Sequence, residues 1–252
     1  MNFTNKIVLI TGGSRGIGRA AAIAFAAKGA TVAINYRSNL AAATETITQL
    51  EGQGHILVKA DIGEPSEVKA MVDEVTAHYG QINILVNNAG IFEYHPLDKV
   101  DYQTWQENWQ RTLNVNLIGA ANVVYCTARI MIEQGGGRIV NVSSRGAFRG
   151  EPLQPAYGAS KAGMNAMGQS LAQALAPFNI FVGTIAPGFV ETDMAKEVLE
   201  GPDGENIRSQ SPVGRVARPE EVAHGILFLA SEGAEFMTGA ILDINGASYL
   251  RS

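Results

Sequence analysis

A tyrosine and a lysine four residues apart carry the clearest chemistry in the chain. Tyr157 and Lys161 lie in a segment whose apolar periodicity predicts a helix, so the spacing places both side chains on one helix face. A free tyrosine has a pKa of about 10, too high for acid–base work at neutral pH. A neighbouring ammonium stabilises the phenolate and lowers that pKa. The pair therefore predicts a proton donor and acceptor, although the same spacing also occurs by chance on helix surfaces.

A serine lies shortly before this pair. The run Asn141-Val142-Ser143-Ser144 ends a predicted strand just ahead of the helix that carries Tyr157. A hydroxyl beside the tyrosine can donate a hydrogen bond to a substrate carbonyl and stabilise the negative charge that develops on its oxygen. Ser144 and Tyr157 are therefore expected to face one crevice.

A glycine-rich turn near the N-terminus predicts a nucleotide site. It reads Thr11-Gly12-Gly13-Ser14-Arg15-Gly16-Ile17-Gly18 and lies between a predicted strand and a predicted helix. In such a turn Gly12 allows a tight bend, Gly16 admits a pyrophosphate close to the backbone, and Gly18 lets helix and strand pack closely. Free N–H groups and the helix dipole favour the anion. The alternative is an ordinary glycine turn.

The end of the second predicted strand bears on the type of dinucleotide. It reads Asn35-Tyr36-Arg37-Ser38 and lacks the acidic residue that binds the ribose 2′-hydroxyl of NAD. Arg37 and Arg15 would instead hold a 2′-phosphate, which favours NADP(H). The alternative is that both are solvated surface arginines.

Strand-like apolar runs alternate with segments of helical period along the whole chain. Strands are expected at residues 7–10, 31–35, 56–59, 82–86, 138–142, 180–185 and 240–244, and helices at 17–28, 41–50, 66–79, 102–132, 156–176 and 219–230. This alternation predicts an α/β fold of Rossmann type, a doubly wound parallel seven-stranded sheet with helices on both faces. We expect one domain over residues 1–252, with a substrate loop at about 189–213 and a mobile polar stretch at 197–210.

Composition excludes several classes of protein. With 46% hydrophobic and 17% charged residues the chain can bury a core, so disorder is excluded. A net charge of −5 argues against nucleic-acid binding. No run approaches the roughly 18 apolar residues of a membrane span, and the first apolar run is too short for a secretion signal. The four histidines lack metal-ligand spacing, so no catalytic metal is expected. A cytoplasmic protein is predicted.

The ordered motifs resemble the short-chain dehydrogenase/reductase family over nearly the whole chain. Besides the glycine turn and the tyrosine–lysine pair, they include Asn87-Asn88-Ala89-Gly90 and Pro187-Gly188. The most similar subgroup is the 3-oxoacyl-(acyl-carrier-protein) reductases and related carbonyl reductases. The resemblance implies NADP(H)-dependent reduction of a ketone or 3-oxoacyl carbonyl to a secondary alcohol, by hydride transfer with a tyrosine proton donor.

The resemblance also implies residue roles. Tyr157 would be the general acid, Lys161 would lower its pKa, Ser144 would orient the carbonyl, and Asn116 would hold a relay water. Cofactor contacts would come from Gly12, Ser14, Arg15, Gly16, Ile17, Gly18, Tyr36, Arg37, Ser38, Asp61, Ile62, Asn88, Ala89, Gly90, Tyr157, Lys161, Pro187, Gly188, Val190 and Thr192. The flanking residues Phe148, Leu153, Gln154 and Phe189 are expected to line a mainly apolar substrate pocket, with polarity confined to its catalytic side. His95 is a further candidate for the border of this pocket.

Departures from the subgroup bear on partners. Carrier-protein reductases often place basic residues where this chain has Gln134-Gly135-Gly136 and Pro177-Phe178-Asn179. These differences argue against docking of an acidic acyl carrier protein and favour a small-molecule carbonyl or alcohol substrate. A dedicated 3-oxoacyl-(acyl-carrier-protein) reductase of fatty acid synthesis remains the alternative, and a non-catalytic nucleotide-sensing regulator is the alternative of another class. The family implies a homotetramer, assembled through the two long helices.

Overall fold

A parallel sheet of seven strands forms the centre of the computed structural model, which describes residues 1–251. Its strand order is β3-β2-β1-β4-β5-β6-β7, and every neighbouring pair runs parallel. The strands are β1 (Ile7–Ile10), β2 (Thr31–Tyr36), β3 (Ile56–Lys59), β4 (Ile84–Asn87), β5 (Gly137–Val142), β6 (Ile180–Pro187) and β7 (Ile241–Ile244). The predicted doubly wound seven-stranded sheet is confirmed, with boundaries that differ by at most two residues.

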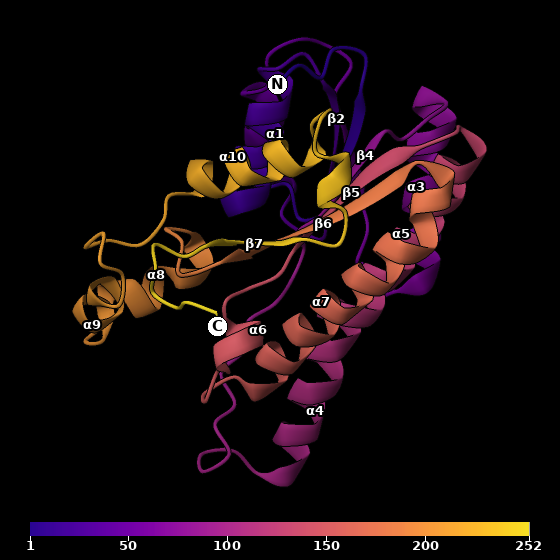
Figure 1. The fold of residues 1–252 in the computed structure, drawn as a ribbon. Helices are drawn as coiled ribbons and strands as arrows, with labels where there is room; N and C mark the ends of the chain where they lie inside the picture. Colours follow the sequence, from indigo (N-terminus) through magenta and orange to yellow (C-terminus); the bar gives the residue numbers. More distant parts are fainter. Residues whose placement is uncertain (252) are drawn as a thin grey trace.

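Helices cover both faces of the sheet (Figure 1). On one face lie α1 (Gly16–Ala26), α2 (Leu40–Thr48) and α10 (Pro219–Ala230); on the other lie α3 (Pro65–Tyr79), α5 (Ala120–Glu133) and α7 (Pro155–Leu175). In β1 the fully buried Val8 and Ile10 belong to the first core, whereas Leu9 between them belongs to the second. Such two-sided burial explains why the strands are continuous apolar runs rather than alternating ones.

The single helix predicted over residues 102–132 is interrupted. The structure has α4 (Tyr102–Leu113), then the six-residue π-helix η1 (Asn114–Gly119), and then α5. The wider turn packs against the loop after β3, where the Asn114 side chain donates to the Gly63 carbonyl at 2.9 Å. A Cβ at Gly119 would lie 2.2 Å from the Ile62 carbonyl oxygen, so only glycine allows this approach. Short π segments of this kind often occur at functional sites.

The run Tyr102–Glu133 corrects the expectation that no segment approaches the length of a membrane span. By length and composition it is long and apolar enough to cross a membrane, with a mean hydropathy of 1.4 in its best window. In this structure 44% of that window is buried, and α5 contacts α3, β4 and β5. These contacts are the packing of a core helix.

The segment predicted as a substrate loop contains two helices. These are α8 (Asp193–Glu200) and α9 (Gly204–Ser209), which contact each other through a small apolar cluster of Leu199, Ile207 and Val216. The stretch 197–210, predicted as a mobile loop, is therefore mostly helical. The remaining elements are α6 (Gly146–Arg149), η2 (Ala176–Phe178) and η3 (Glu235–Met237).

Candidate active site

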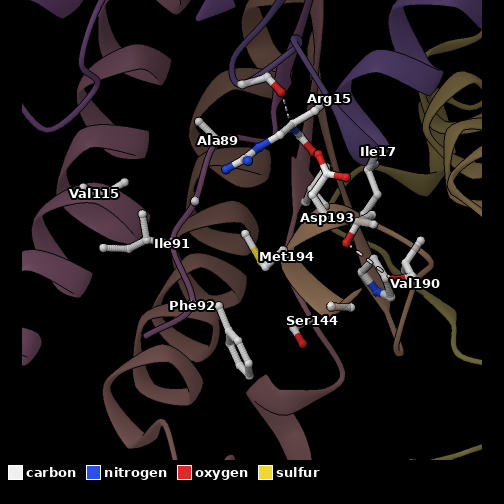
Figure 2. A pocket seen from close by; sticks show the side chains of 18 of the residues that line it. Arg15, Ile17, Ala89, Ile91, Phe92, Val115, Ser144, Val190, Asp193 and Met194 are labelled. Atoms are coloured by element: carbon white, nitrogen blue, oxygen red, sulfur yellow. Dashed lines mark hydrogen bonds between the residues drawn. The ribbon is translucent and has the colours of Figure 1, made fainter. Parts of the chain in front are cut away.

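A cavity of about 490 Å³ opens at the carboxyl ends of the central strands. Figure 2 shows Arg15 at one end and Ser144 with Phe92 at the other, with Met194 of α8 between them. Nineteen of the twenty predicted cofactor residues line it, namely Gly12, Ser14, Arg15, Gly16, Ile17, Tyr36, Arg37, Ser38, Asp61, Ile62, Asn88, Ala89, Gly90, Tyr157, Lys161, Pro187, Gly188, Val190 and Thr192. The glycine turn and the tyrosine–lysine pair therefore share one cavity.

The glycine turn adopts the conformation that its residue types predict. Gly12 has a φ of +62°, and a Cβ there would lie 2.9 Å from the Ala89 Cα. Gly16 has a φ of +54°, which also favours glycine. Gly18 is the one predicted cofactor residue that does not line the cavity. A Cβ on Gly18 would lie 2.3 Å from the Gly12 carbonyl oxygen, so its role is close packing of α1 against the turn.

Thr11 joins the glycine turn to the loop after β4. Its Oγ1 accepts hydrogen bonds from the backbone N–H groups of Asn88 and Ala89 at 2.9 and 3.0 Å. In return the Asn88 side-chain amide donates to the carbonyls of Thr11 and Gly12. Sequence reasoning gave Thr11 no role of its own, since a threonine at the end of a strand is an ordinary feature. Asn88 thus has a structural function besides lining the cavity.

Two serines follow β5, and they make different hydrogen bonds. Both are buried and both line the cavity. The Ser144 Oγ accepts a hydrogen bond from the Gly146 N–H at 3.0 Å, whereas the Ser143 Oγ donates to the Lys161 carbonyl at 3.2 Å. Ser143 therefore fixes β5 to α7, and Ser144 is the serine whose hydroxyl is available beside Tyr157.

Burial dominates the proton chemistry of the tyrosine–lysine pair. Burial raises the pKa of Tyr157 to about 12, and a hydrogen bond with the Ser144 hydroxyl opposes the rise. Phe92 packs edge-on against the tyrosine ring at 4.7 Å. Burial also lowers the pKa of Lys161 to about 8. Its Nζ donates to the Val142 carbonyl at 2.8 Å and lies 5.7 Å from the centre of the tyrosine ring. The spacing predicted a tyrosine pKa lowered by the lysine, whereas in this structure burial raises it.

Asn116, predicted as a catalytic residue, does not line the cavity. It is fully buried in η1, where its amide accepts from the Ile91 N–H and donates to the Ile91 carbonyl at 2.8 and 2.9 Å. The same amide donates to the Ser160 hydroxyl of α7. A Cβ on Gly90 would lie 3.2 Å from the Asn116 Oδ1 and 3.5 Å from the Lys161 Nζ, so these groups are neighbours. Asn116 thus connects the loop after β4 to the helix that carries the lysine.

Most of the predicted substrate pocket lies elsewhere. Of the four residues only Phe189 lines the cavity. Phe148 lies beneath the Arg251 guanidinium, Leu153 is 47% exposed, and Gln154 is buried at the start of α7. α6, which carries Phe148, packs against α7.

Charged residues also line the cavity near the serine and the tyrosine, on the side where polarity was expected. They are Arg145 and Glu151. His95 does not border the cavity. It is fully buried, and its Nε2 accepts from the Ala156 N–H at 3.3 Å, so it holds the first turn of α7 next to Tyr157.

Comparisons with known proteins agree with this geometry. A sequence model of the family described as enoyl-(acyl carrier protein) reductase matches residues 12–247. The 3-oxoacyl-(acyl-carrier-protein) reductase FabG of Thermotoga maritima is 40% identical over 248 residues, which cover 98% of each chain. The chain belongs to the short-chain dehydrogenase/reductase family.

Other short-chain dehydrogenases/reductases are similar over the same length. The L-rhamnose 1-dehydrogenase (NAD(P)(+)) of Sphingomonas sp. strain SKA58 is 39% identical, with 97% of this chain and 96% of that protein covered. The structure of a short-chain type dehydrogenase/reductase from Mycobacterium ulcerans has a TM-score of 0.91 at 31% identity, covering 98% of this chain and 91% of the other. Membership makes the protein an oxidoreductase that acts on carbonyl or CH–OH groups.

Metal ligands do not gather within residues 1–251, where no group of three or more His, Cys, Asp or Glu side chains could hold an ion. That the reaction of this protein needs no catalytic metal stays a prediction.

The buried lysine leads to a prediction about stability. Lys161 is 3% exposed, and its pKa falls from 10.5 unfolded to about 8 folded. Its burial therefore costs roughly 3 kcal/mol below pH 8, a cost that fades as the pH rises to 10.5. Lys161→Met should raise Tm at pH 7, lose that advantage by about pH 10.5, and abolish turnover. Thermal unfolding measured across this range checks it, with the exposed Lys28→Met as control. A lower Tm of Lys161→Met at pH 7 would contradict it.

Proposed function

We propose that this protein is an NADP(H)-dependent carbonyl reductase that converts a ketone or 3-oxoacyl carbonyl to a secondary alcohol. The observation that carries the proposal is the shared cavity, in which Ser144, Tyr157 and Lys161 lie at one end and the glycine turn at the other. A nicotinamide cofactor, when bound, supplies the hydride. The chain's own residues would bind the carbonyl and manage the proton.

The glycine turn fits a dinucleotide phosphate. At Gly12 and Gly16 the backbone has positive φ, and a Cβ at Gly12 would collide with the facing loop, so the cradle requires glycine. The turn leads into the N-terminus of α1, which favours an anion. Arg15 and Arg37 line the same part of the cavity. The Arg37 guanidinium lies 4.0 Å from the Asp61 carboxylate and is 62% exposed, so its donors are available for a 2′-phosphate.

The proton chemistry follows from burial. With a pKa of about 12, Tyr157 is protonated at neutral pH and can donate its proton to a carbonyl oxygen. The Ser144 hydroxyl, beside the tyrosine, would donate a hydrogen bond to the same oxygen and orient it. Proton transfer leaves a phenolate, which the ammonium of Lys161 stabilises below pH 8. Phe92 covers the tyrosine ring and limits access of water.

The assignment of the acid and of the serine is tested by substitution. Tyr157→Phe should lower turnover by at least ~10²-fold, because the acid is lost, and leave NADPH affinity nearly unchanged, because the ring still packs. Ser144→Ala should also lower turnover, and Ser143→Ala much less. Steady-state oxidation of NADPH with a ketone substrate measures all three. Near-wild-type turnover of Tyr157→Phe would rule out this mechanism.

The coenzyme preference is tested at Arg37. Each charge-assisted hydrogen bond to the 2′-phosphate is worth about 1.5–3 kcal/mol, so Arg37→Ala should raise KM for NADPH roughly tenfold or more. KM for NADH should hardly change, since NADH has no 2′-phosphate. Arg129→Ala, which removes an exposed arginine from α5, is the matched control. A wild-type preference for NADH would show that the lack of an acidic residue after β2 does not indicate NADP(H).

A dedicated 3-oxoacyl-(acyl-carrier-protein) reductase is the second candidate. Relatives that bear this name, including FabG of Thermotoga maritima, support it. Against it, the chain has a net charge of −5, and the two positions that are often basic in that subgroup are not basic here. The enoyl reductases of the superfamily space tyrosine and lysine more widely than Tyr157 and Lys161, which disfavours that activity.

The carrier question is decided by comparing substrates. Free acetoacetyl thioester should be reduced about as efficiently as the same group on an acyl carrier protein, at low and at high salt. The reason is that recognition of an acidic carrier relies on a basic patch. The measurement is kcat/KM for both substrates. A large, salt-sensitive preference for the carrier-linked form would instead establish the fatty-acid-synthesis role.

We also propose a cytoplasmic homotetramer, assembled through α4, α5 and α7. Exposed apolar side chains on the first two of these helices and on η1, namely Tyr102, Ile118 and Tyr125, support such an interface. A regulator without catalysis is disfavoured, because the chain retains Asn116, Ser144, Tyr157 and Lys161.

A further inference from the structure

Glu151 places a carboxylate in the cavity that nothing in the mechanism uses. It follows α6, lines the cavity and is partly buried. Among residues 1–251 its carboxylate makes neither a hydrogen bond nor an ion pair, although the carboxylates of other partly buried glutamates, such as Glu93, are paired. A carboxylate that lines a cavity and has no donor from the protein can accept a hydrogen bond from a ligand in place of water.

Two glycines give this carboxylate its position. A Cβ on Gly146 would lie 2.4 Å from the Glu151 Oε1, so the carboxylate lies directly over the residue whose N–H bonds to Ser144. A Cβ on Gly158, next to Tyr157, would lie 3.5 Å from the Glu151 backbone N. Glu151 is therefore adjacent to both residues that would hold the reacting carbonyl, and its charge contributes to the raised pKa of Tyr157.

The two neighbouring arginines have partners of their own. Arg145 donates to the Ser248 hydroxyl and to the Gln210 amide oxygen, each at 2.6 Å, and Arg149 donates to the same Gln210 oxygen at 3.1 Å. Their positive charges lower the pKa of Glu151, but burial outweighs them and raises it. Among residues 1–251 neither guanidinium forms an ion pair with the carboxylate, which remains available to a substrate.

The chemistry of the missing donor is restricted. A saturated acyl chain has no donor and would bury the carboxylate without compensation. An ammonium would be a third cation beside Arg145 and Arg149, with a single carboxylate to balance them. A hydroxyl donates to the carboxylate, carries no charge and suits a site whose other polar groups are already paired.

We propose that Glu151 selects carbonyl substrates that bear a hydroxyl one or two carbons from the reacting carbon, as in hydroxyketones and sugars. The selection rests on the proposed carbonyl reductase function and narrows its substrate class. Glu151 accepts the hydrogen bond of that hydroxyl while Ser144 and Tyr157 hold the carbonyl oxygen.

Substrates of one carbon skeleton test this selection. The test compares kcat/KM with NADPH for 3-hydroxybutan-2-one and 4-hydroxybutan-2-one against butan-2-one, in wild type, Glu151→Leu and Glu151→Gln. In wild type at least one hydroxyketone should be preferred. Glu151→Leu should lower the hydroxyketone-to-ketone ratio about tenfold or more, the value of a hydrogen bond to a charged acceptor. Glu151→Gln should keep part of the preference, because its amide oxygen still accepts. Glu205→Gln, an exposed charge on α9, should leave the ratio at its wild-type value.

The outcomes separate this inference from the proposed function. A ratio that Glu151→Leu leaves at its wild-type value overturns the selection and leaves the reductase assignment intact. No turnover of any of the three ketones by wild type overturns both. If Glu151→Leu does not fold, Gly146→Ala replaces it in the test. A Cβ at position 146 would displace the Glu151 carboxylate, and alanine is well suited to the helix α6. An unchanged ratio in Gly146→Ala counts equally against the selection.

Discussion

From β1 the chain builds the sheet outward in one direction, to β2 and β3, and then returns to the other side of β1 with β4. The Thr11 hydroxyl joins the two loops that follow β1 and β4 at this point. It accepts hydrogen bonds from two backbone N–H groups of the loop after β4. In the opposite direction, the Asn88 side-chain amide donates to the carbonyls of Thr11 and Gly12. Because all strands are parallel, every neighbouring strand delivers its last residues to this opening. From the far side of the same loop, Asn116 bonds to Ile91 and to Ser160. The loop after β4 is thus hydrogen-bonded to the glycine turn at one end and, through Asn116, to the helix that carries Tyr157 at the other.

Burial gives the reacting end of the cavity its properties, and it does so at a cost in stability. Lys161 is buried as an amine that titrates near pH 8, with one hydrogen bond to the Val142 carbonyl. Tyr157 is kept protonated well above neutral pH. A protein selected for stability alone would place an apolar side chain at position 161. The buried lysine therefore lowers stability, as groups needed for activity often do. His95 and Asn116, both fully buried, hold the backbone around the pair rather than touching the cavity.

The sequence determines these features to different degrees. The strands and the glycine turn could be predicted, because buried apolar runs and positive φ at Gly12 leave a direct mark on residue types. The π segment could not, since it depends on the approach of Gly119 to the Ile62 carbonyl, a contact between segments far apart in sequence. The helices α8 and α9 were missed because their polar residues and the intervening Gly-Pro-Asp-Gly read as a loop, whereas packing of Leu199 against Ile207 orders them. Phe148 and Leu153 were misplaced for a related reason: adjacency in sequence to Ser144 does not tell which side of a short helix faces the cavity.

Similarity to known proteins likewise indicates the type of reaction but not the substrate. Relatives of nearly equal identity, 40% and 39%, carry the names of a carrier-protein reductase and a rhamnose dehydrogenase. Overall similarity therefore cannot choose between an acyl chain and a sugar. Ser144, Tyr157 and Lys161 would bind the carbonyl and transfer the proton, and they leave the rest of the substrate to other residues. Arg145 and Glu151, from the segment 145–151, line the cavity beside them. An apolar chain gains nothing from these charges and must desolvate them, whereas a hydroxylated substrate can bind them in place of water. If Glu151 selects the substrate as proposed, substrate choice depends on the seven residues that follow Ser144.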